Sequence, residues 1–531
     1  MPEEAILKLI SLRPKQLIKN MLLSLLVILN TMILPNFVSA SPSERKLMKK
    51  INIGIVGPKK TLDPVLGYNL FDFLVIQCVY QTLVRINADG NITSDLAQSW
   101  EISKDSKTYT FQLNSKAKFS DGKAVTAKDV AMSLSRHLWH NSKSIIKNYL
   151  SELLDGAHSI TESSIHPSIR IVSENTVEIK LKEPYPPFLN VLSMPGFSIT
   201  SADEKVRNQN IGSGHLQAHF DTSNETWIFN PNPYYLGAKA SINEIRIKHL
   251  KDATEAFDSI NKGINDVVLG LMSETGPGLA SQLPNTYSVF STNSLSFAHL
   301  IFNMKKQEFK NIKLRQSMGQ YLNNLARLVN IPSSNFHHQS TFIPKGVLPL
   351  PYFEREIPMV SDVELKNIIN SHFSGRPIKI ILSEGRLPKD FVLKLKVNLN
   401  KASSLIHVEE LPVGEYRKRR DAGDYDIAYL GYIGNFSDPD GFLDCIQENN
   451  FPGINVDSKV LFESIQQVRF ASNKTDRLNG YIKALRQFED QWTVIPLYQT
   501  SIPILHHKDI IIPDTHYRYE SELWSFLWKS Q

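Results

Sequence analysis

The chain has 531 residues, 42% of them hydrophobic, and its 59 lysines and arginines nearly balance its 53 aspartates and glutamates, for a formal net charge of +6. This length predicts roughly three domain-sized units. Nucleic-acid binding usually shows as a basic stripe with interleaved aromatic residues. Here the one polybasic run, residues 417–420, abuts Asp421 in a chain of well-mixed sign, so we expect a solvated helix face and no nucleic-acid partner.

The first 40 residues have the pattern of a signal peptide. Four basic residues precede an apolar run at 21–34, and residues 38–40 (Val-Ser-Ala) are small, as a signal peptidase requires. The run is shorter than the ~20 residues that span a bilayer, so we expect cleavage rather than a retained anchor. Ser41 follows instead of Cys, so we expect no lipid anchor and a freely soluble periplasmic protein.

A hairpin followed by a capped helix is the most strongly specified unit of the chain. Residues 108–113 alternate polar and apolar side chains, the period of a half-buried strand, and a polar turn pairs them with residues 99–102. Thr126 and Asp129 are spaced as in a capping box, with Asp in the Glu place. We expect a helix from there to about His140.

The same unit resembles the signature of extracytoplasmic solute-binding proteins of the oligopeptide/dipeptide/nickel class, family 5 of the receptors that serve ABC importers. The matching motifs are L-A-x-S-W-E at 96–101, T-Y-T-F-x-L at 108–113, F-S-D-G at 119–122 and T-A-x-D-V at 126–130. Weaker matches extend the resemblance over about residues 50–510. The chain also departs from the family, because Asn323 and Asn324 stand where the family has an Asp-Arg pair.

The resemblance implies an α/β, two-lobed periplasmic-binding-protein fold with mixed sheets flanked by helices. Strand patterns at 377–382 and 406–411 around a helix pattern at 390–401 agree with it, since this βαβ rhythm favours a parallel sheet. The implied divisions are a signal peptide at 1–40, a first lobe at 46–295 plus 498–531 with an extra subdomain at about 62–190, and a second lobe at 296–497. The implied hinge strands lie near 294–297 and 497–500.

The chain has two cysteines, Cys78 and Cys445, too few for a disulfide framework and incomplete as a metal site. The family mapping places Cys78 in the first lobe and Cys445 in the second. A disulfide needs Cα atoms within about 7 Å and would tie together lobes that must separate. We therefore expect two free, largely buried thiols.

The implied ligand site follows Gly431. Peptide-binding members of the family have Gly-Trp-x-x-Asp-Tyr-x-x-Pro here, and the Asp pairs with the ammonium of the ligand. Tyr432 takes the Trp place and Asn435 the Asp place, so the charge is missing; Asn435 is also a plausible turn residue beside Gly434. Asp438 or Asp440 could substitute for the missing charge. The expected ligand-contacting residues are Tyr429, Tyr432, Ile433, Gly434, Asn435 and Phe436.

The sequence contains none of the common catalytic motifs. The sequence has no Gly-x-Ser-x-Gly elbow, His-Glu-x-x-His helix, phosphate loop or Gly-x-Gly-x-x-Gly fingerprint. The adjacent pairs 337–338 and 506–507 are His-His, but neighbouring side chains point in different directions and no third ligand is near in the sequence. We expect no catalysis, no metal site and no cofactor.

The expected function is therefore a periplasmic solute-binding receptor that delivers a short peptide or peptide-like solute to the membrane permease of an ABC importer. We expect a monomer. A non-peptide solute such as a nickel chelate, haem or an oligosaccharide remains an alternative, as does a sensor or scaffold without transport. A counter-ion for a ligand carboxylate could come from Arg376, Arg386 or Arg417, and the sequence does not choose among them.

Overall fold

The structure is a computed structural model. It describes residues 50–57, 61–67, 70–87, 91–156, 159–237, 242–271, 283–329, 336–349, 352–434, 436–446, 454–466, 468–471 and 473–510. The predicted signal peptide lies outside these residues. Within them, no helix combines the length and the apolar character that crossing a membrane requires.

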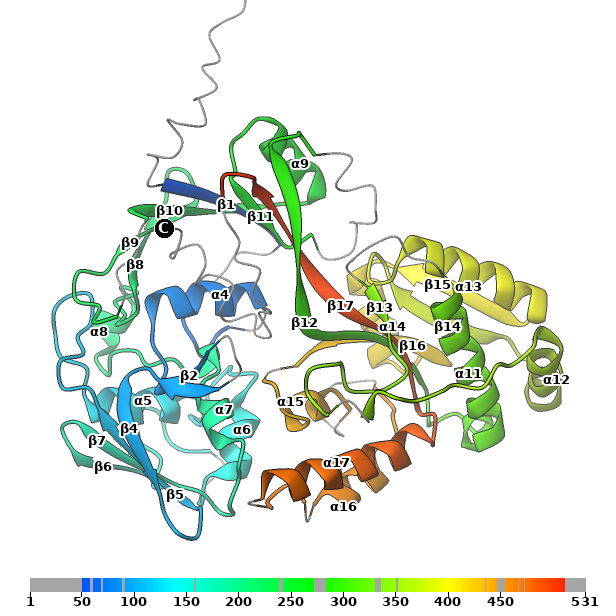
Figure 1. Ribbon diagram of the computed structural model, residues 1–531, viewed down its shortest axis with the longest axis horizontal. Helices are drawn as coiled ribbons and strands as arrows, with labels where there is room; N and C mark the ends of the chain where they lie inside the picture. Colours follow the sequence, from blue (N-terminus) through cyan, green and yellow to red (C-terminus); the bar gives the residue numbers. More distant parts are fainter. Residues whose placement is uncertain are drawn as a thin grey trace, which may run out of the picture. The chain divides into compact units, whose positions relative to one another are not determined.

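A mixed sheet of eleven strands runs through the described residues, in the order β15-β14-β16-β12-β17-β11-β1-β10-β9-β8, with β13 paired to β17 (Figure 1). β14 is parallel to β15 and β16, and β1 is parallel to β10 and β11. The strands are β1 (Lys50–Val56), β8 (Leu216–Asp221), β9 (Thr226–Pro231), β10 (Glu244–Leu250), β11 (Val267–Leu269), β12 (Tyr287–Phe302), β13 (Phe336–His338), β14 (Ile378–Ser383), β15 (Ile406–Leu411), β16 (Ile427–Ile433) and β17 (Val494–His507).

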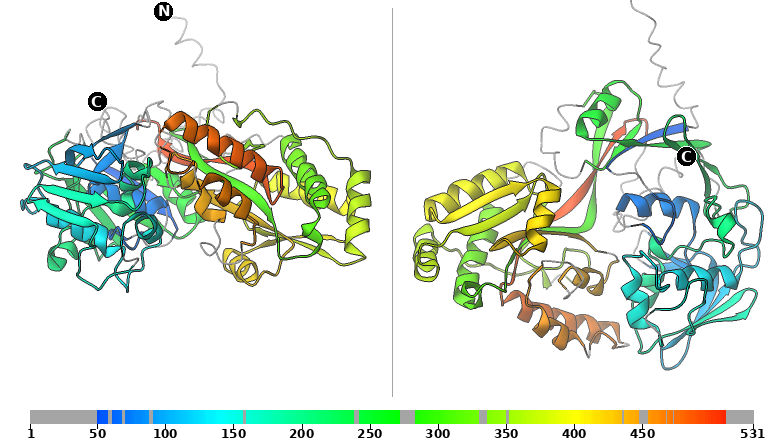
Figure 2. Two further views of the ribbon diagram at one scale, coloured as in Figure 1. Left: turned by 90° about the horizontal axis from the view of Figure 1, so that it is seen from below. Right: turned by 180° about the vertical axis from the view of Figure 1, so that it is seen from behind.

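The two long strands β12 and β17 join the two ends of this sheet. They pair antiparallel along most of their length and lie side by side in both views of Figure 2. The register shifts between Asn293 and Ser296, an irregularity of the kind that bends and twists a strand locally. The segments 294–297 and 497–500 lie at this irregularity, and their role as a hinge stays a prediction, as do the lobe boundaries.

Helices cover both faces of the β14-β16-β12 end of the sheet, because successive strand residues point to opposite sides. On one side Ile427 shares an apolar cluster with α11 (Ile312–Leu328), α12 (Asp362–Phe373) and α13 (Lys389–Ala402). On the other, Ala428 shares a cluster with α14 (Val413–Asp421), α15 (Asp440–Leu443), α16 (Lys459–Ile465) and α17 (Lys474–Glu489). The predicted βαβ rhythm is confirmed, since β14 and β15 are parallel and α13 connects them.

The opposite end of the sheet has its own two helices. α4 (Leu70–Val79) shares an apolar cluster with β1, β8, β9, β10 and β11. α9 (Ala253–Asn261) shares a second cluster with alternate residues of β10 and β11. Both clusters include a residue of β17, Ile504 in the first and Leu505 in the second.

A separate apolar cluster forms the core of residues 83–199, which fold around two small sheets. The predicted hairpin is confirmed: β4 and β5 are antiparallel, and Tyr109, Phe111 and Leu113 are buried on one side of β5. The elements are β2 (Val84–Ile86) with β3 (Ile92–Ser94), the sheet β4 (Ala97–Ile102), β5 (Thr108–Leu113), β7 (Thr176–Lys180) and β6 (Ile169–Ser173), and the helices α5 (Ala127–Arg136), α6 (Lys147–Leu153) and α7 (Phe188–Leu192). The short helix α8 (Glu204–Arg207) follows.

The capped start of α5 is confirmed, but its predicted end is wrong. Oδ2 of Asp129 accepts hydrogen bonds from the backbone N (2.8 Å) and the hydroxyl (2.7 Å) of Thr126, and Oδ1 accepts from the backbone N of Ala202 (2.7 Å). The helix ends at Arg136 instead of about His140. The reason is tertiary: the backbone N of His140 donates to Ile160, so the chain pairs with a distant segment instead of continuing the helix.

Both cysteines are free and buried, as predicted. Cys78 lies in α4, and burial raises the pKa of its thiol well above the usual range. Cys445 lies just after α15, and its Sγ is 3.2 Å from the carbonyl oxygen of Phe442.

Replacing Asp129 with alanine should destabilise the start of α5. The change removes one acceptor for three donors, and each hydrogen bond is worth about 0.5–1.5 kcal/mol, more when the acceptor is charged. We expect faster amide hydrogen exchange at Thr126 and Ala202 and a lower melting temperature. The control is Lys128→Ala, at the exposed neighbouring position, which should leave both measurements unchanged. Unaltered exchange at Ala202 in the Asp129 variant would contradict the assignment.

His299 in β12 should make stability depend on pH. It is fully buried, its Nδ1 accepts from the backbone N of Leu497 (3.2 Å), its Nε2 lies 3.0 Å from the carbonyl of Phe342, and burial lowers its pKa to about 4. Between pH 6.5 and 4 the unfolded state binds the proton and the folded state does not, so the wild type loses about 1.4 kcal/mol per pH unit as pH falls.

The neutral variant His299→Gln lacks this loss. Urea unfolding midpoints of both proteins should therefore converge as pH falls from 6.5 to 4. A gap that stays constant with pH would contradict the neutral, buried histidine.

Candidate ligand-binding site

The predicted ligand-contacting segment begins on β16 and continues toward α15. β16 pairs antiparallel with β12, so that Ile433 lies opposite Ser296 and Tyr432 opposite Phe297. Ile433 and Gly434 are half-buried. The predicted segment therefore starts where β12 and β17 change register.

Tyr429 and Tyr432 both pack against the apolar cluster that contains Ala428. Tyr432 is half-buried, and its ring centroid is 6.1 Å from that of Phe297. Tyr429 forms an edge-to-face contact with Tyr416 (6.3 Å), whose hydroxyl donates to the backbone carbonyl of Tyr429. Burial raises the pKa of Tyr429 to about 12. Tyr429 packs in addition against the cluster that contains Ile427.

Glycine is required at position 434 because the ring of Phe442 lies close to the backbone there. Its backbone N donates to the carbonyl of Leu295 (2.7 Å), and a Cβ here would lie 2.2 Å from the ring of Phe442. A side chain at this position would displace either the ring or the strand end.

Asn435 lies outside the described residues, and Phe436 is placed in an apolar core. The side chain of Phe436 is 2% exposed and belongs to the cluster formed by residues 83–199. Its ring meets that of Tyr149 edge to face at 5.7 Å. In this conformation Phe436 therefore packs residues after the predicted hinge against residues before it.

A buried carboxylate, Asp440, organises the end of the segment. The residue is 2% exposed, and four side chains donate to it. Oδ2 accepts from the hydroxyl of Tyr185 (2.8 Å), from Nε of Arg469 (3.0 Å) and from Nη2 of Arg477 (3.4 Å), and Oδ1 accepts from the hydroxyl of Tyr481. Tyr185 precedes the predicted hinge, and the other three donors follow it.

The electrostatics of this cluster follow from burial. Burial, with Asp440 next in size, raises the pKa of the Tyr185 and Tyr481 hydroxyls well above the usual range, so both stay protonated donors. Burial alone would lower the pKa of Arg469, but the combined effects of Asp440, Tyr185 and Tyr481 outweigh it and raise the pKa. The guanidinium of Arg469 also lies over the ring of Tyr185, 5.5 Å from the centroid.

Asp438 is held by Arg477 through two hydrogen bonds, of 2.6 Å and 2.8 Å. Its pKa is raised by burial, an effect that Arg477 opposes. Asp438 and Asp440 were the candidates to replace the charge missing at Asn435. Both carboxylates already pair with arginines, so neither is free to pair with a ligand cation in this conformation. No local pattern in the sequence pointed to the donors of this cluster, because they come from distant segments: Tyr185, Arg469, Arg477 and Tyr481.

The three arginines considered for a ligand carboxylate have different surroundings. Arg376 pairs with Asp426 (2.8 Å) and Glu308 (2.7 Å). Arg417 is exposed on α14, and Arg386 lies close enough to Tyr429 to lower its pKa against the effect of burial. Of the three arginines, Arg386 is the one that acts electrostatically on a predicted site residue, Tyr429.

The described residues contain no group of three or more His, Cys, Asp or Glu placed to hold a metal ion. His338 instead faces Asn323, with Nε2 3.2 Å from Oδ1. The amide of Asn323 donates to the carbonyls of Gln339 and Pro496, so this departure from the family pattern serves internal hydrogen bonding.

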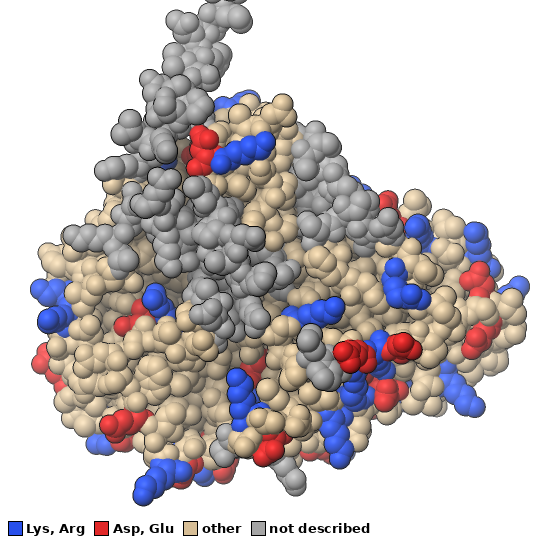
Figure 3. All heavy atoms as spheres, in the orientation of Figure 1, with Lys and Arg blue, Asp and Glu red and all other residues tan. Residues whose placement is uncertain are grey.

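On the face seen in Figure 3, basic and acidic side chains are interspersed.

Comparisons with known proteins find relatives along most of the chain. A family model described as bacterial extracellular solute-binding proteins, family 5 middle, matches residues 91–349. Among curated relatives, a probable D,D-dipeptide-binding periplasmic protein, DdpA, of Escherichia coli is 24% identical over 86% of this chain and 90% of its own length. The nickel-binding periplasmic protein of the same organism is 22% identical over 89% and 92%.

Among solved structures, the periplasmic binding protein DppA of Helicobacter pylori in complex with the peptide STSA superposes with a TM-score of 0.69 at 19% identity, covering 88% of this chain and 97% of that one. The predicted two-lobed periplasmic-binding-protein fold, with mixed sheets flanked by helices, is therefore confirmed. Over residues 91–349 the chain is similar to the bacterial extracellular solute-binding proteins of family 5, and its similarity to curated periplasmic binding proteins extends along most of its length.

Proposed function

We propose that this protein is a soluble, unlipidated, monomeric periplasmic receptor that binds a short peptide or peptide-like solute and delivers it to the permease of an ABC importer, without catalysing a reaction. The observation that carries the proposal is similarity along nearly the whole chain to a probable dipeptide-binding periplasmic protein. The fold of a peptide-bound periplasmic protein agrees with it.

The Asp440 cluster supports a receptor that closes. Proteins of this architecture close two lobes about a hinge around the ligand. Tyr185 lies before the predicted hinge and Asp440 after it, so closure would form their hydrogen bond. Closure would also form the contact between Phe436 and Tyr149.

A non-peptide solute is the second candidate, and Asn435 favours it. A carboxylate makes the stronger charge-assisted bond to an ammonium group, and an amide offers only a partial charge. The nickel-binding relative supports the same alternative, since it is similar over as much of the chain as the dipeptide-binding one.

Asn435→Asp should create a preference for a free amino end. Losing the ionic part of a hydrogen bond costs about tenfold in affinity. Calorimetric titration with one tripeptide, free and N-acetylated, should show little discrimination by the wild type and about tenfold by the variant.

Ser437→Asp is the matched control, because it adds the same charge two residues further on; it should leave the two affinities unchanged. A strong preference for the free tripeptide in the wild type would contradict the role of Asn435. No binding of either tripeptide would favour the non-peptide alternative.

Tyr185→Phe should shift the receptor toward its open form. The variant loses a donor to a buried carboxylate only in the closed form, a bond worth about 1.5–3 kcal/mol. Small-angle scattering of the ligand-free protein should give a larger radius of gyration than for the wild type. Tyr481→Phe is the control, since Tyr481 and Asp440 lie on the same side of the predicted hinge. Equal radii for the two variants would contradict a closure contact.

A further inference from the structure

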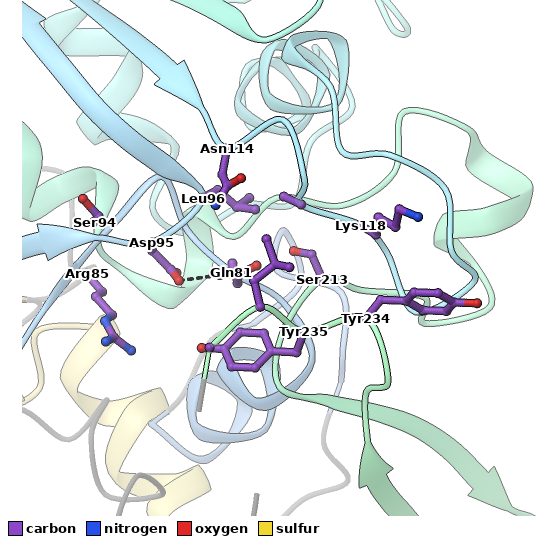
Figure 4. Close-up of a pocket in the computed structure, with 13 residues that line it drawn as sticks. Gln81, Arg85, Ser94, Asp95, Leu96, Asn114, Lys118, Ser213, Tyr234 and Tyr235 are labelled. Carbon is purple, nitrogen blue, oxygen red and sulfur yellow. Dashed lines mark hydrogen bonds between the residues drawn. The ribbon is translucent and has the colours of Figure 1, made fainter. Parts of the chain in front are cut away.

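A cavity of about 220 Å³ is lined by residues that all precede the predicted hinge, and none of them belongs to β16. Figure 4 shows this lining. Four stretches far apart in the sequence form its walls. Its lining residues are Gln81, Arg85, Ser94, Asp95, Leu96, Asn114, Ala117, Lys118, Ser213, Tyr234, Tyr235, Leu236 and Gly237. The volume corresponds to roughly seven water molecules at liquid density, enough for one sugar-sized molecule.

Ser213 is the least expected residue of this lining. Its side chain is 1% exposed, and its hydroxyl has no hydrogen-bond partner among the described residues. Such a buried, unsatisfied group is uncommon and requires an explanation. Figure 4 shows the hydroxyl beside Gln81 in the cavity.

The backbone around Ser213 is fixed, so the hydroxyl is held in place. Gly214 donates to the carbonyl of Val79 (2.7 Å), and the carbonyl of Gly212 accepts from Ser120 (2.9 Å). A Cβ at Gly212 would lie 2.0 Å from the carbonyl oxygen of Val79, so glycine permits this approach to the end of α4.

Asp95 orients Gln81 at the same wall. Its Oδ1 accepts from Nε2 of Gln81 (2.6 Å), and its Oδ2 accepts from the backbone N of Thr82 (2.9 Å). The carboxylate is thus engaged by protein donors. This hydrogen bond holds the amide of Gln81 beside Ser213, where it is a second neutral polar group of the cavity wall.

Two cations lie on opposite sides of the cavity in Figure 4, Arg85 on one and Lys118 on the other. Burial raises the pKa of Asp95, and Arg85 opposes that effect electrostatically. Nζ of Lys118 lies over the ring of Tyr234, 5.7 Å from its centroid. Tyr235 adds a second ring, which meets His215 edge to face at 5.8 Å. The two cations outnumber the one carboxylate of the lining, Asp95, so the cavity favours an anion.

We propose that this cavity is a second ligand site, which binds a small hydroxylated carboxylate of the sugar-acid class. Ser213 and Gln81 bond its hydroxyls, the tyrosine rings cover its apolar ring face, and Arg85 or Lys118 pairs with its carboxylate. The site lies on one side of the predicted hinge, so its occupancy does not depend on the proposed peptide transport.

The test uses D-glucuronate, D-glucose and the tripeptide as probes in calorimetry and ligand-observed NMR on the purified protein. The wild type should bind glucuronate saturably and more tightly than glucose, without competition from the tripeptide. Ser213→Ala should weaken glucuronate binding about three- to tenfold, the effect of losing one hydrogen bond. Arg85→Met with Lys118→Met should abolish the preference for glucuronate over glucose.

Ser198→Ala is the matched control. Its hydroxyl is also buried and unpartnered among the described residues, but Ser198 does not line the cavity, so glucuronate binding should be unchanged. No saturable binding by the wild type, equal losses in both serine variants, or displacement by the tripeptide would overturn the proposal. Because the tripeptide titration is independent, failure here leaves the proposed transport function standing.

Discussion

A carboxylate buried to 2% exposure, that of Asp440, is the constraint on which the contact between the two parts of this receptor depends. Removing an ion from water costs several kcal/mol, and only good geometry with several donors offsets that cost. Here two guanidinium groups and two hydroxyls supply the donors. Since one hydroxyl belongs to Tyr185, separating the parts would leave the carboxylate with fewer donors unless water enters. Electrostatics and conformation are therefore coupled at this residue.

The strands that join the two ends of the sheet are where a movement of the two parts would bend the structure. β12 and β17 carry the hydrogen bonding from one end of the sheet to the other, and their register shifts next to Ser296. A strand irregularity permits local bending with the loss of few hydrogen bonds. Gly434, whose backbone N bonds Leu295, lies beside it, so the β16 segment would move with any bending of β12.

What the sequence predicted well was local. The alternation at 108–113 specifies a strand because its polar and apolar residues repeat with a period of two. Thr126 and Asp129 specify a helix start because a capping box needs only four consecutive residues. The end of α5 was wrong because pairing with Ile160 decides it, and no periodicity near His140 encodes that contact. The Asp440 donors were missed for the same reason: Tyr185 lies 255 residues away. Long-range polar contacts have no spacing to detect.

The cavity around Ser213 and the Asp440 cluster belong to one continuous piece of structure. The carbonyl of Gln81, a cavity residue, accepts from the backbone N of Ile199, and Ile199 shares the apolar cluster of residues 83–199 with Tyr185. A ligand in the cavity can alter closure only if it binds the two conformations with different affinity. All the lining residues precede the predicted hinge, so the ligand could affect closure only through this shared core. Without such a difference, the two sites would fill independently.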